Sequence, residues 1–364
     1  MVECKDGDGV PVSILGLGKE ELEAWLADRG EKPYRAKQIL EWLFVKRVRG
    51  FDEMSNLGQD LRSGLARAFY INPLETVEAN SANDATRKFL FRLRDRRLVE
   101  SVFIKASPGS QGDQSERQTI CLSSQVGCAY DCKFCASGLA GFTRNLTAAE
   151  IVAQVLQVEA ESGEKVDNVV FMGMGEPLAN LKQVSQAIKI LNAHWGVGIG
   201  GRRITVSTSG LAPQIEKLAD DTEAQIRLAV SLHGASDEVR QRIMPVNEKY
   251  DLKRLFEALH YWRERHKQRI TFEYILIEGV NDGLDQARLL AKRAQSVSAL
   301  VNLIPYNTVD GLHWKRPSED HQEAFLLAVK SGGVAATLRR EKGGGINAAC
   351  GQLRLRRESL ENCD

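Results

Sequence analysis

Apolar runs of six to eight residues alternate with amphipathic stretches between about residues 119 and 305. The runs are apolar at most positions, as in IRLAVSLH (226–233) and ITFEYILI (270–277). Strands of this composition are buried on both faces, which is typical of a parallel sheet covered by helices. Six such strands predict a partial α/β barrel, and a doubly wound open sheet is the alternative. The runs begin near Thr119, Asn168, Ile204, Ile226, Ile270 and Leu300.

Most stretches between these strands have the spacing of helices, as over residues 147–161 and 252–266. Thr147 and Glu150 form an S/T-x-x-E capping box, which places the start of the first of these helices. In a barrel, polar residues at the carboxyl ends of strands form the active site. Those ends are residues 173–176, 207–210, 231–233, Glu278 and Asn307.

The chain before residue 114 follows two other patterns. Residues 19–28 and 34–45 have helical spacing, whereas residues 86–105 alternate with a period of two, as a β-hairpin does. Glu100 falls on a mostly apolar face of that hairpin, an unusual place for a carboxylate. We expect a small helical N-terminal accessory domain at residues 1–75, a β-hairpin linker at 76–113, an α/β core at 114–344 and a C-terminal tail at 345–364.

Composition narrows the class of protein. The 364 residues carry 49 Lys and Arg against 48 Asp and Glu, a net charge of +1, with 43% hydrophobic and 27% charged residues. These values are typical of a globular protein and argue against disorder or a uniformly basic chain. No run approaches the ~18 apolar residues that span a membrane, and the first residues lack the apolar segment of a secretory signal. We therefore expect a cytoplasmic protein without membrane partners.

Three of the seven cysteines, Cys128, Cys132 and Cys135, form the spacing C-x3-C-x2-C. An odd cysteine count disfavours a disulfide scaffold. Structural zinc needs four ligands, and the nearest histidine in the sequence, His194, is far downstream. Three thiolates on one tight loop suit a four-iron cluster with one iron that a substrate can coordinate. A zinc site is the alternative.

The C-x3-C-x2-C motif after the first barrel strand is similar to that of the radical S-adenosylmethionine (SAM) superfamily. The longer string CLSSQVGCAYDCKFCASGLAGFTRNLT, followed by GMGEPL, VSTSG, SLH, IPYN and NAACGQL, resembles the RlmN/Cfr family of RNA adenosine methyltransferases. GEKPYRAKQILEWLF and FDEM near the N-terminus also resemble RlmN, so the likeness covers most of the chain. It implies a partial (β/α)6 TIM-like radical SAM barrel.

The resemblance also implies two cofactors, a [4Fe-4S] cluster on Cys128, Cys132 and Cys135, and SAM chelating the open iron. Glycines after the second barrel strand let the backbone approach a ligand, and Glu176 can accept a hydrogen bond from the SAM ammonium. The SAM contacts implied by the family motifs are Gly175, Glu176, Ser207, Ser231, Leu232, His233 and Asn307.

Adenine C2 carries no acidic proton, so ordinary methyl transfer from SAM fails there. The resemblance implies that Cys350 carries a methyl group to the ring, that Cys121 releases the crosslinked product by forming a disulfide with Cys350, and that Glu100 takes the ring proton. One feature departs from the family. Residues 342–346 read KGGGI, where the family commonly has an acidic residue before the cysteine, so the positioning of this loop is in question.

The implied substrates are an adenosine of large-subunit (23S) ribosomal RNA near the peptidyl transferase centre and, as a second candidate, an anticodon-loop adenosine of tRNA. The target base must leave its stack to meet Cys350, so base flipping is expected. We also expect a monomer that takes electrons from an external flavodoxin-like donor. Three basic clusters bracket the implied catalytic segments and suggest a phosphate-binding rim. They are Arg87, Lys88, Arg92, Arg94, Arg96 and Arg97; Lys46, Arg47 and Arg49; and Arg339, Arg340, Lys342, Arg354, Arg356 and Arg357.

Three alternatives stay open. Cfr-type methylation at C8 of the same adenosine would use the same cysteines. A non-catalytic RNA-binding protein with a structural metal would contain no iron and cleave no SAM. Radical SAM chemistry on a small molecule would leave Cys121 and Cys350 without a role.

Overall fold

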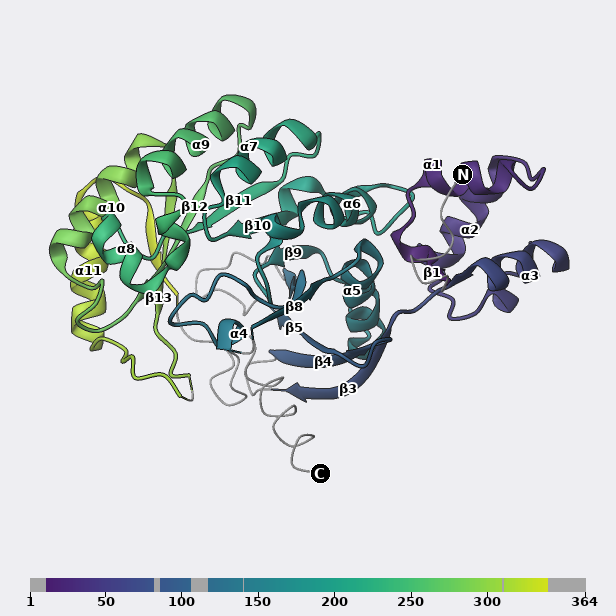
Figure 1. The fold of residues 1–364 in the computed structure, drawn as a ribbon, viewed down its shortest axis with the longest axis horizontal. Coiled ribbons are helices and arrows are strands. Elements are labelled where there is room, and N and C mark those ends of the chain that lie inside the picture. The colour runs from purple at the N-terminus through teal and green to yellow at the C-terminus, as the bar shows by residue number, and fades with distance from the viewer. Residues whose placement is uncertain (1–10, 82–85, 106–116, 140, 310, 340–364) are drawn as a thin grey trace.

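The computed structural model describes residues 11–81, 86–105, 117–139, 141–309 and 311–339, and within them ten strands form one mixed sheet (Figure 1). The strand order is β14-β13-β12-β11-β10-β9-β6-β5-β4-β3. Neighbours from β6 to β14 are parallel, whereas β3, β4, β5 and β6 pair antiparallel. The strands are β3 (Leu74–Ser81), β4 (Arg87–Leu93), β5 (Leu98–Lys105), β6 (Gln118–Cys121), β9 (Asn168–Phe171), β10 (Ile204–Thr208), β11 (Arg227–Ser231), β12 (Thr271–Leu276), β13 (Leu300–Pro305) and β14 (Ala336–Leu338).

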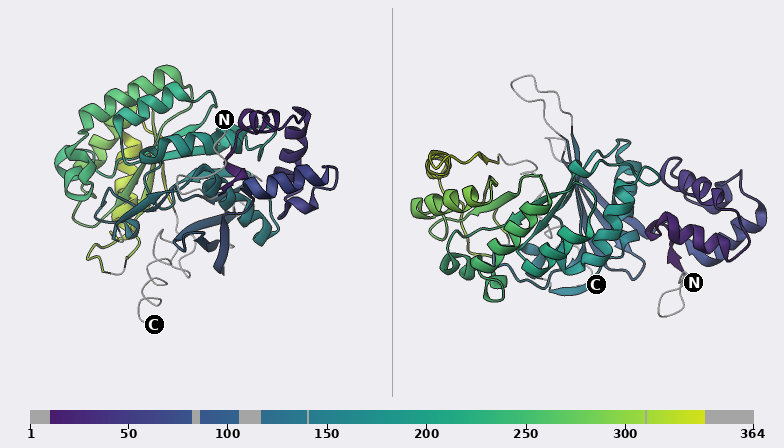
Figure 2. Two further views of the ribbon diagram at one scale, coloured as in Figure 1. Left: turned by 45° about the vertical axis from the view of Figure 1, so that its right-hand side comes forward. Right: turned by 90° about the horizontal axis from the view of Figure 1, so that it is seen from above.

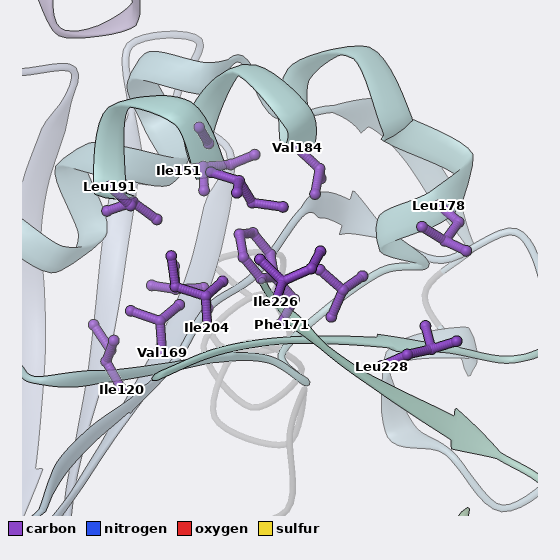
Figure 3. Close-up of a cluster of buried hydrophobic side chains, with 14 of the residues drawn as sticks. Ile120, Ile151, Val169, Phe171, Leu178, Val184, Leu191, Ile204, Ile226 and Leu228 are labelled. Carbon is purple, nitrogen blue, oxygen red and sulfur yellow. The ribbon is translucent and has the colours of Figure 1, made fainter. Parts of the chain in front are cut away.

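Helices cover one face of the parallel strands (Figures 1 and 2). Val169, Phe171 and Ile204 point from the sheet into a buried cluster with Ile151 and Val184 of the covering helices (Figure 3). Because successive side chains on a strand point to opposite faces, their sequence neighbours point into the barrel. The covering helices are α5 (Ala148–Ser162), α6 (Leu181–Asn192), α7 (Ala212–Asp221), α9 (Leu252–Arg265), α10 (Leu284–Ser296) and α11 (Glu319–Ser331).

The predicted partial barrel is confirmed, and the doubly wound alternative is wrong. The parallel strands follow one another in sequence order across the sheet. A doubly wound sheet would reverse its strand order at a switch point and carry helices on both faces. All six predicted strands are present. Thr147 caps α5 as expected, since its hydroxyl accepts from the Glu150 N–H and Glu150 accepts from the Thr147 N–H.

Two strands of the ten-stranded sheet were not predicted. β14 spans only Ala336–Leu338, which is too short to show a period of its own. β3 spans Leu74–Ser81 and pairs with β4, so the hairpin of β4 and β5 continues the main sheet as part of a three-stranded antiparallel edge.

The N-terminal helices lie beside α5, at the end of the molecule away from β14 (Figures 1 and 2). Both predicted helices are present, as α1 (Lys19–Ala27) and α2 (Tyr34–Phe44), together with α3 (Gln59–Ala68) and a short parallel pair, β1 (Val12–Ser13) and β2 (Phe69–Tyr70). An ion pair of 2.7 Å between Arg47 and Glu159 connects them to α5. Among the described residues, no helix has the length and apolar character needed to cross a membrane.

Candidate active site

The cysteine loop projects from a short antiparallel pair, β7 (Gln125–Gly127) and β8 (Phe142–Asn145). Gly127 has φ +77°, and a Cβ there would lie 1.8 Å from the carbonyl oxygen of Gly141. The Cys128 N–H donates to that same carbonyl at 3.0 Å. The Lys133 N–H donates to the carbonyl of Ile243, at the end of α8 (Asp237–Ile243), so the loop is held at both of its sides.

Cys128, Cys132 and Cys135 line a cavity of about 290 Å³ at the carboxyl ends of the strands. Five of the seven predicted SAM contacts line it as well, namely Gly175, Glu176, Ser207, Ser231 and His233. Leu232 is fully buried behind the cavity, where its N–H donates to the carbonyl of Glu273. Asn307 lines a neighbouring cavity instead and accepts from Arg316.

Glu176 joins the ends of two strands. One carboxylate oxygen accepts from the N–H of Ser209 at 2.7 Å, and the other accepts from the N–H of Leu178 at 3.0 Å. The side chain is buried, and this burial raises the pKa of Glu176, while the bonds from Ser209 and Leu178 counteract the rise. Gly175 before it has φ +96° and packs on Gln125, where a Cβ would come within 2.5 Å. Both residues therefore shape the cavity wall.

His233 also lines this cavity and has a left-handed backbone, φ +53°. Its ring contacts Phe134 of the cysteine loop edge to face, with 4.8 Å between ring centroids. Burial and, to a lesser extent, the positive charge of Arg240 lower its pKa to about 3. The imidazole is therefore neutral in the physiological range.

The thiols of the loop fit an iron–sulfur cluster by their chemistry. None of the three is part of a disulfide among the described residues, and burial raises the pKa of Cys128 to about 11 and that of Cys132 well above its usual range. Thiols in such surroundings stay protonated until a metal displaces the proton. Within the part of the chain that the structure describes, no three His, Cys, Asp or Glu side chains converge to hold a single metal ion. Cluster cysteines bind separate irons, so they need not converge on one point.

A second cavity of about 460 Å³ runs along the inner face of the barrel. Cys121 of β6 lines it, as do Asn168, Thr205 and Asn302 on the parallel strands. These inward-facing side chains are polar, whereas the side chains on the outer face of the same strands pack against the helices and are apolar. The two cavities have four lining residues in common: Met172, Glu273, Ile304 and Arg339.

Glu273 is the site residue that sequence reasoning missed. It lies on β12, is 7% exposed, and accepts from the Asn302 amide at 2.7 Å. Burial raises its pKa, and Asn302 and Arg339 counteract the rise. In the sequence, Glu273 is the one charged residue of the apolar run ITFEYILI, which indicates a buried acid, but it belongs to no recognised motif.

The three predicted catalytic residues have different outcomes. Glu100 is buried on β5 as expected, and its carboxylate pairs with Lys88 at 2.9 Å. Cys121 is buried at the end of β6, where it is in register with Val102 of β5. Cys350 and most of the third basic cluster lie outside the described residues.

One member of the basic clusters is not available to RNA. Lys88 is fully buried in its ion pair with Glu100, whereas Arg47 is paired with Glu159 and its side chain is 29% exposed. The interpretation of Lys88 as part of a phosphate rim is wrong, because the strand register turns it inward.

Comparison with known proteins agrees with this geometry. The Radical SAM superfamily model matches residues 122–290, and the model of the ribosomal RNA large subunit methyltransferase N-terminal domain matches residues 12–71. A probable dual-specificity RNA methyltransferase RlmN from Akkermansia muciniphila is 52% identical, covering 95% of this chain and 96% of the relative. One of the same name from Staphylococcus saprophyticus is 45% identical, covering 96% of this chain and 94% of the relative.

A solved structure shows the same fold. The crystal structure of a radical SAM methyltransferase from Sphaerobacter thermophilus superposes with a TM-score of 0.87 at 40% identity, covering 94% of this chain and 99% of that chain. Sequence, domain order and fold therefore agree along almost the whole length, and the chain belongs to the RlmN family of radical SAM RNA methyltransferases.

Proposed function

We propose that this enzyme methylates C2 of an adenosine in 23S ribosomal RNA, with an anticodon-loop adenosine of tRNA as a second substrate. The observation that supports this most is the junction of the two cavities. The cavity with the three loop cysteines and the cavity with Cys121 share four lining residues. A methyl donor in the first would stand beside a base in the second. The dual-specificity name of the relatives agrees with two RNA substrates.

Cys128, Cys132 and Cys135 would hold a [4Fe-4S] cluster. When bound, the cluster supplies the electron that cleaves SAM to a 5′-deoxyadenosyl radical. Gly175, Glu176, Ser207, Ser231 and His233 surround the cavity next to these thiols and would bind the rest of SAM. Leu232 would contribute through its backbone, and Asn307 from the adjoining cavity.

The transfer itself would belong to three residues of the chain. Cys350 would carry the methyl group. That methyl would lose one hydrogen atom to the 5′-deoxyadenosyl radical, and its carbon would then bond to C2, giving a covalent adduct with RNA. The adduct would give up one electron to the oxidised cluster, the C2–H bond would break, and Glu100 would take the proton. The Cys121 thiolate then attacks the Cys350 sulfur. An S–S bond forms, the C–S bond breaks, and its electron pair and a proton complete the new methyl group. A flavodoxin-like donor would return the electrons that reduce the disulfide between Cys121 and Cys350 to two thiols.

RNA would bind across the N-terminal helices and the first hairpin. We place the accessory domain at residues 1–75, the hairpin linker at 76–113, the core at 114–344 and the tail at 345–364. The match to the RlmN N-terminal model falls inside the first of these. Arg92, Arg94 and Arg96 line a surface cavity where the two units meet, and Arg94 lies over the ring of Tyr70. We propose that the enzyme acts as a cytoplasmic monomer.

Nucleoside mass spectrometry tests the reaction. Anaerobically reconstituted enzyme, SAM and a reductant are incubated with unmethylated ribosomal RNA or tRNA, and the digest is compared with 2-methyladenosine and 8-methyladenosine standards. 2-Methyladenosine supports the proposal. 8-Methyladenosine would indicate Cfr-type chemistry. Cleavage of SAM with neither product would contradict the RNA substrate, and protein without iron or SAM cleavage would contradict catalysis altogether.

A further inference from the structure

Lys88 and Glu100 form an ion pair inside the antiparallel part of the sheet. The Nζ of Lys88 lies 2.9 Å from Oε2 of Glu100, and the two side chains are 0% and 2% exposed. Lysine and glutamate are almost never buried this completely unless they are paired. Losing one partner of such a pair leaves a buried charge without compensation. Burying two charged side chains costs free energy even when they are paired, so the pair calls for a role besides packing.

The register of the strands shows which face of the sheet carries this ion pair. Lys88 on β4 is opposite Val102 on β5, and Val102 is in turn opposite Cys121 on β6. Residues directly opposite each other in a sheet share a face, and so do residues two apart on one strand. Lys88, Glu100, Val102 and Cys121 therefore share one face.

That face is the inner face of the barrel. Ser101, which alternates with Glu100, donates to Gln154 of α5 at 2.8 Å and so marks the outer face. Val102 and Cys121 both line the second cavity. Glu100 is the next residue along this face, diagonal to Cys121, and diagonal pairs in a sheet lie about 7–8 Å apart.

We propose that Lys88 is a positioning residue for Glu100, holding its carboxylate in place beside the cavity that contains Cys121. The inference rests on the proposed function, in which the C2–H bond of the RNA adduct breaks, its electron pair stays in the adenine, and the proton forms an O–H bond on Glu100. The ion pair fixes the carboxylate at the edge of that cavity, and a general base acts only from within hydrogen-bond reach of the proton that it takes. The ion pair also removes the rotational freedom of an isolated side chain.

The test compares release of RNA from the covalent adduct in full-length reconstituted holoenzyme. The variants are Lys88→Met, Lys88→Arg and Glu100→Gln. Lys105→Met is the matched control, because Lys105 lies on the same hairpin in a partly exposed ion pair with Glu164. Denaturing gels measure adduct, mass spectrometry measures methylated nucleoside, and 5′-deoxyadenosine measures SAM cleavage.

We expect Lys88→Met to cleave SAM and form adduct like the wild type, while product release falls ~100-fold, the size of a general-base contribution. Glu100→Gln should show the same defect. Lys88→Arg should stay within about threefold of wild type because it keeps the cation, and Lys105→Met should match wild type. A purely structural pair would lower the melting temperature without accumulating adduct.

The outcomes separate the two claims. Adduct accumulation in Glu100→Gln with normal release in Lys88→Met overturns the role of Lys88 alone. Normal release in Glu100→Gln overturns the proposed base, and the inference with it. If Lys88→Met does not fold, Lys88→Gln replaces it, since the amide keeps a hydrogen bond without the charge. Slow release of RNA from the Lys88→Gln adduct, with normal release from the Lys88→Arg adduct, then supports the inference. Equal release rates in these two variants overturn it.

Discussion

The backbone N–H of Ile275 donates a 3.0 Å hydrogen bond to Nδ1 of His233, and this bond joins the ends of β12 and β11. Because Nδ1 accepts, the neutral ring carries its hydrogen on Nε2. His233 lines the cavity beside the cysteine loop. The imidazole can therefore serve a ligand there as a neutral donor that does not titrate near pH 7.

His233 makes the free energy of unfolding depend on pH. Burial lowers its folded pKa to about 3, whereas the unfolded value is the ordinary 6.5. Between these values the unfolded state binds more protons, so the stability from this group is complete above 6.5 and is lost as pH falls toward 3. When the pH falls from 7 to 5, we expect the free energy of unfolding of wild type to drop by about 2 kcal/mol more than that of His233→Asn. Asparagine is chosen because it tolerates the positive φ at this position. Denaturant titration of the apoprotein measures this, and equal losses would contradict it.

Gly127 should be required for the cysteine loop to close. An alanine there would place Cβ 1.8 Å from the Gly141 carbonyl oxygen, in a backbone that already has φ +77°. We expect Gly127→Ala to lose most of its iron on reconstitution. Gly141→Ala is the matched control, since Gly141 also has positive φ but nothing within 4 Å of its Cβ position. It should cost about 1 kcal/mol of stability and keep its iron. Equal iron content in the two variants would count against this account of the loop.

Cys132 should be needed for iron, and Cys121 should not. The first lines the cavity at the strand ends, and the second lies at the end of β6 in the other cavity. We expect Cys132→Ala to bind little iron and sulfide after anaerobic reconstitution, whereas Cys121→Ala and Cys4→Ala bind the wild-type amount. Iron and acid-labile sulfide assays decide this, and full iron in Cys132→Ala would exclude it as a ligand.

Cys121→Ala should instead trap RNA on the enzyme. Without the resolving thiol, the bond from Cys350 to the base has no attacking partner, so we expect a covalent protein–RNA species on a denaturing gel and almost no released methyladenosine. Cys350→Ala in the same assay should give neither adduct nor product while SAM is still cleaved. Free RNA alone from Cys121→Ala would contradict the resolving role.

Glu273 should affect methylation more than cofactor binding, because it lies where the two cavities join. We expect Glu273→Ala to keep its iron and to lose at least about tenfold in RNA methylation, the cost of about one hydrogen bond to a charged or polar group. Asn302→Ala, which removes the amide that donates to Glu273 and the oxygen that accepts from Thr337 but leaves the carboxyl group, should have a smaller effect. Unchanged methylation in Glu273→Ala would show that the carboxyl group has only a structural role in the barrel.

Much of the fold could be predicted from local pattern. The six parallel strands and the cap of α5 at Thr147 depend on apolar period and on a hydrogen bond between near neighbours, and both are local properties. β14 could not be predicted, because a strand of three residues has no period and exists only through its pairing with β13.

The candidate site divides in the same way. By itself, the sequence determined which residues lie at strand ends and on the cysteine loop, since spacing along the chain decides both. Only the tertiary structure decided that Lys88 compensates Glu100 instead of facing RNA, that Arg47 joins Glu159, and that Glu273 lies between two cavities. Those relationships depend on register between strands and on packing between distant segments. A charged residue looks the same in the sequence whether its partner is water or a buried side chain from another element.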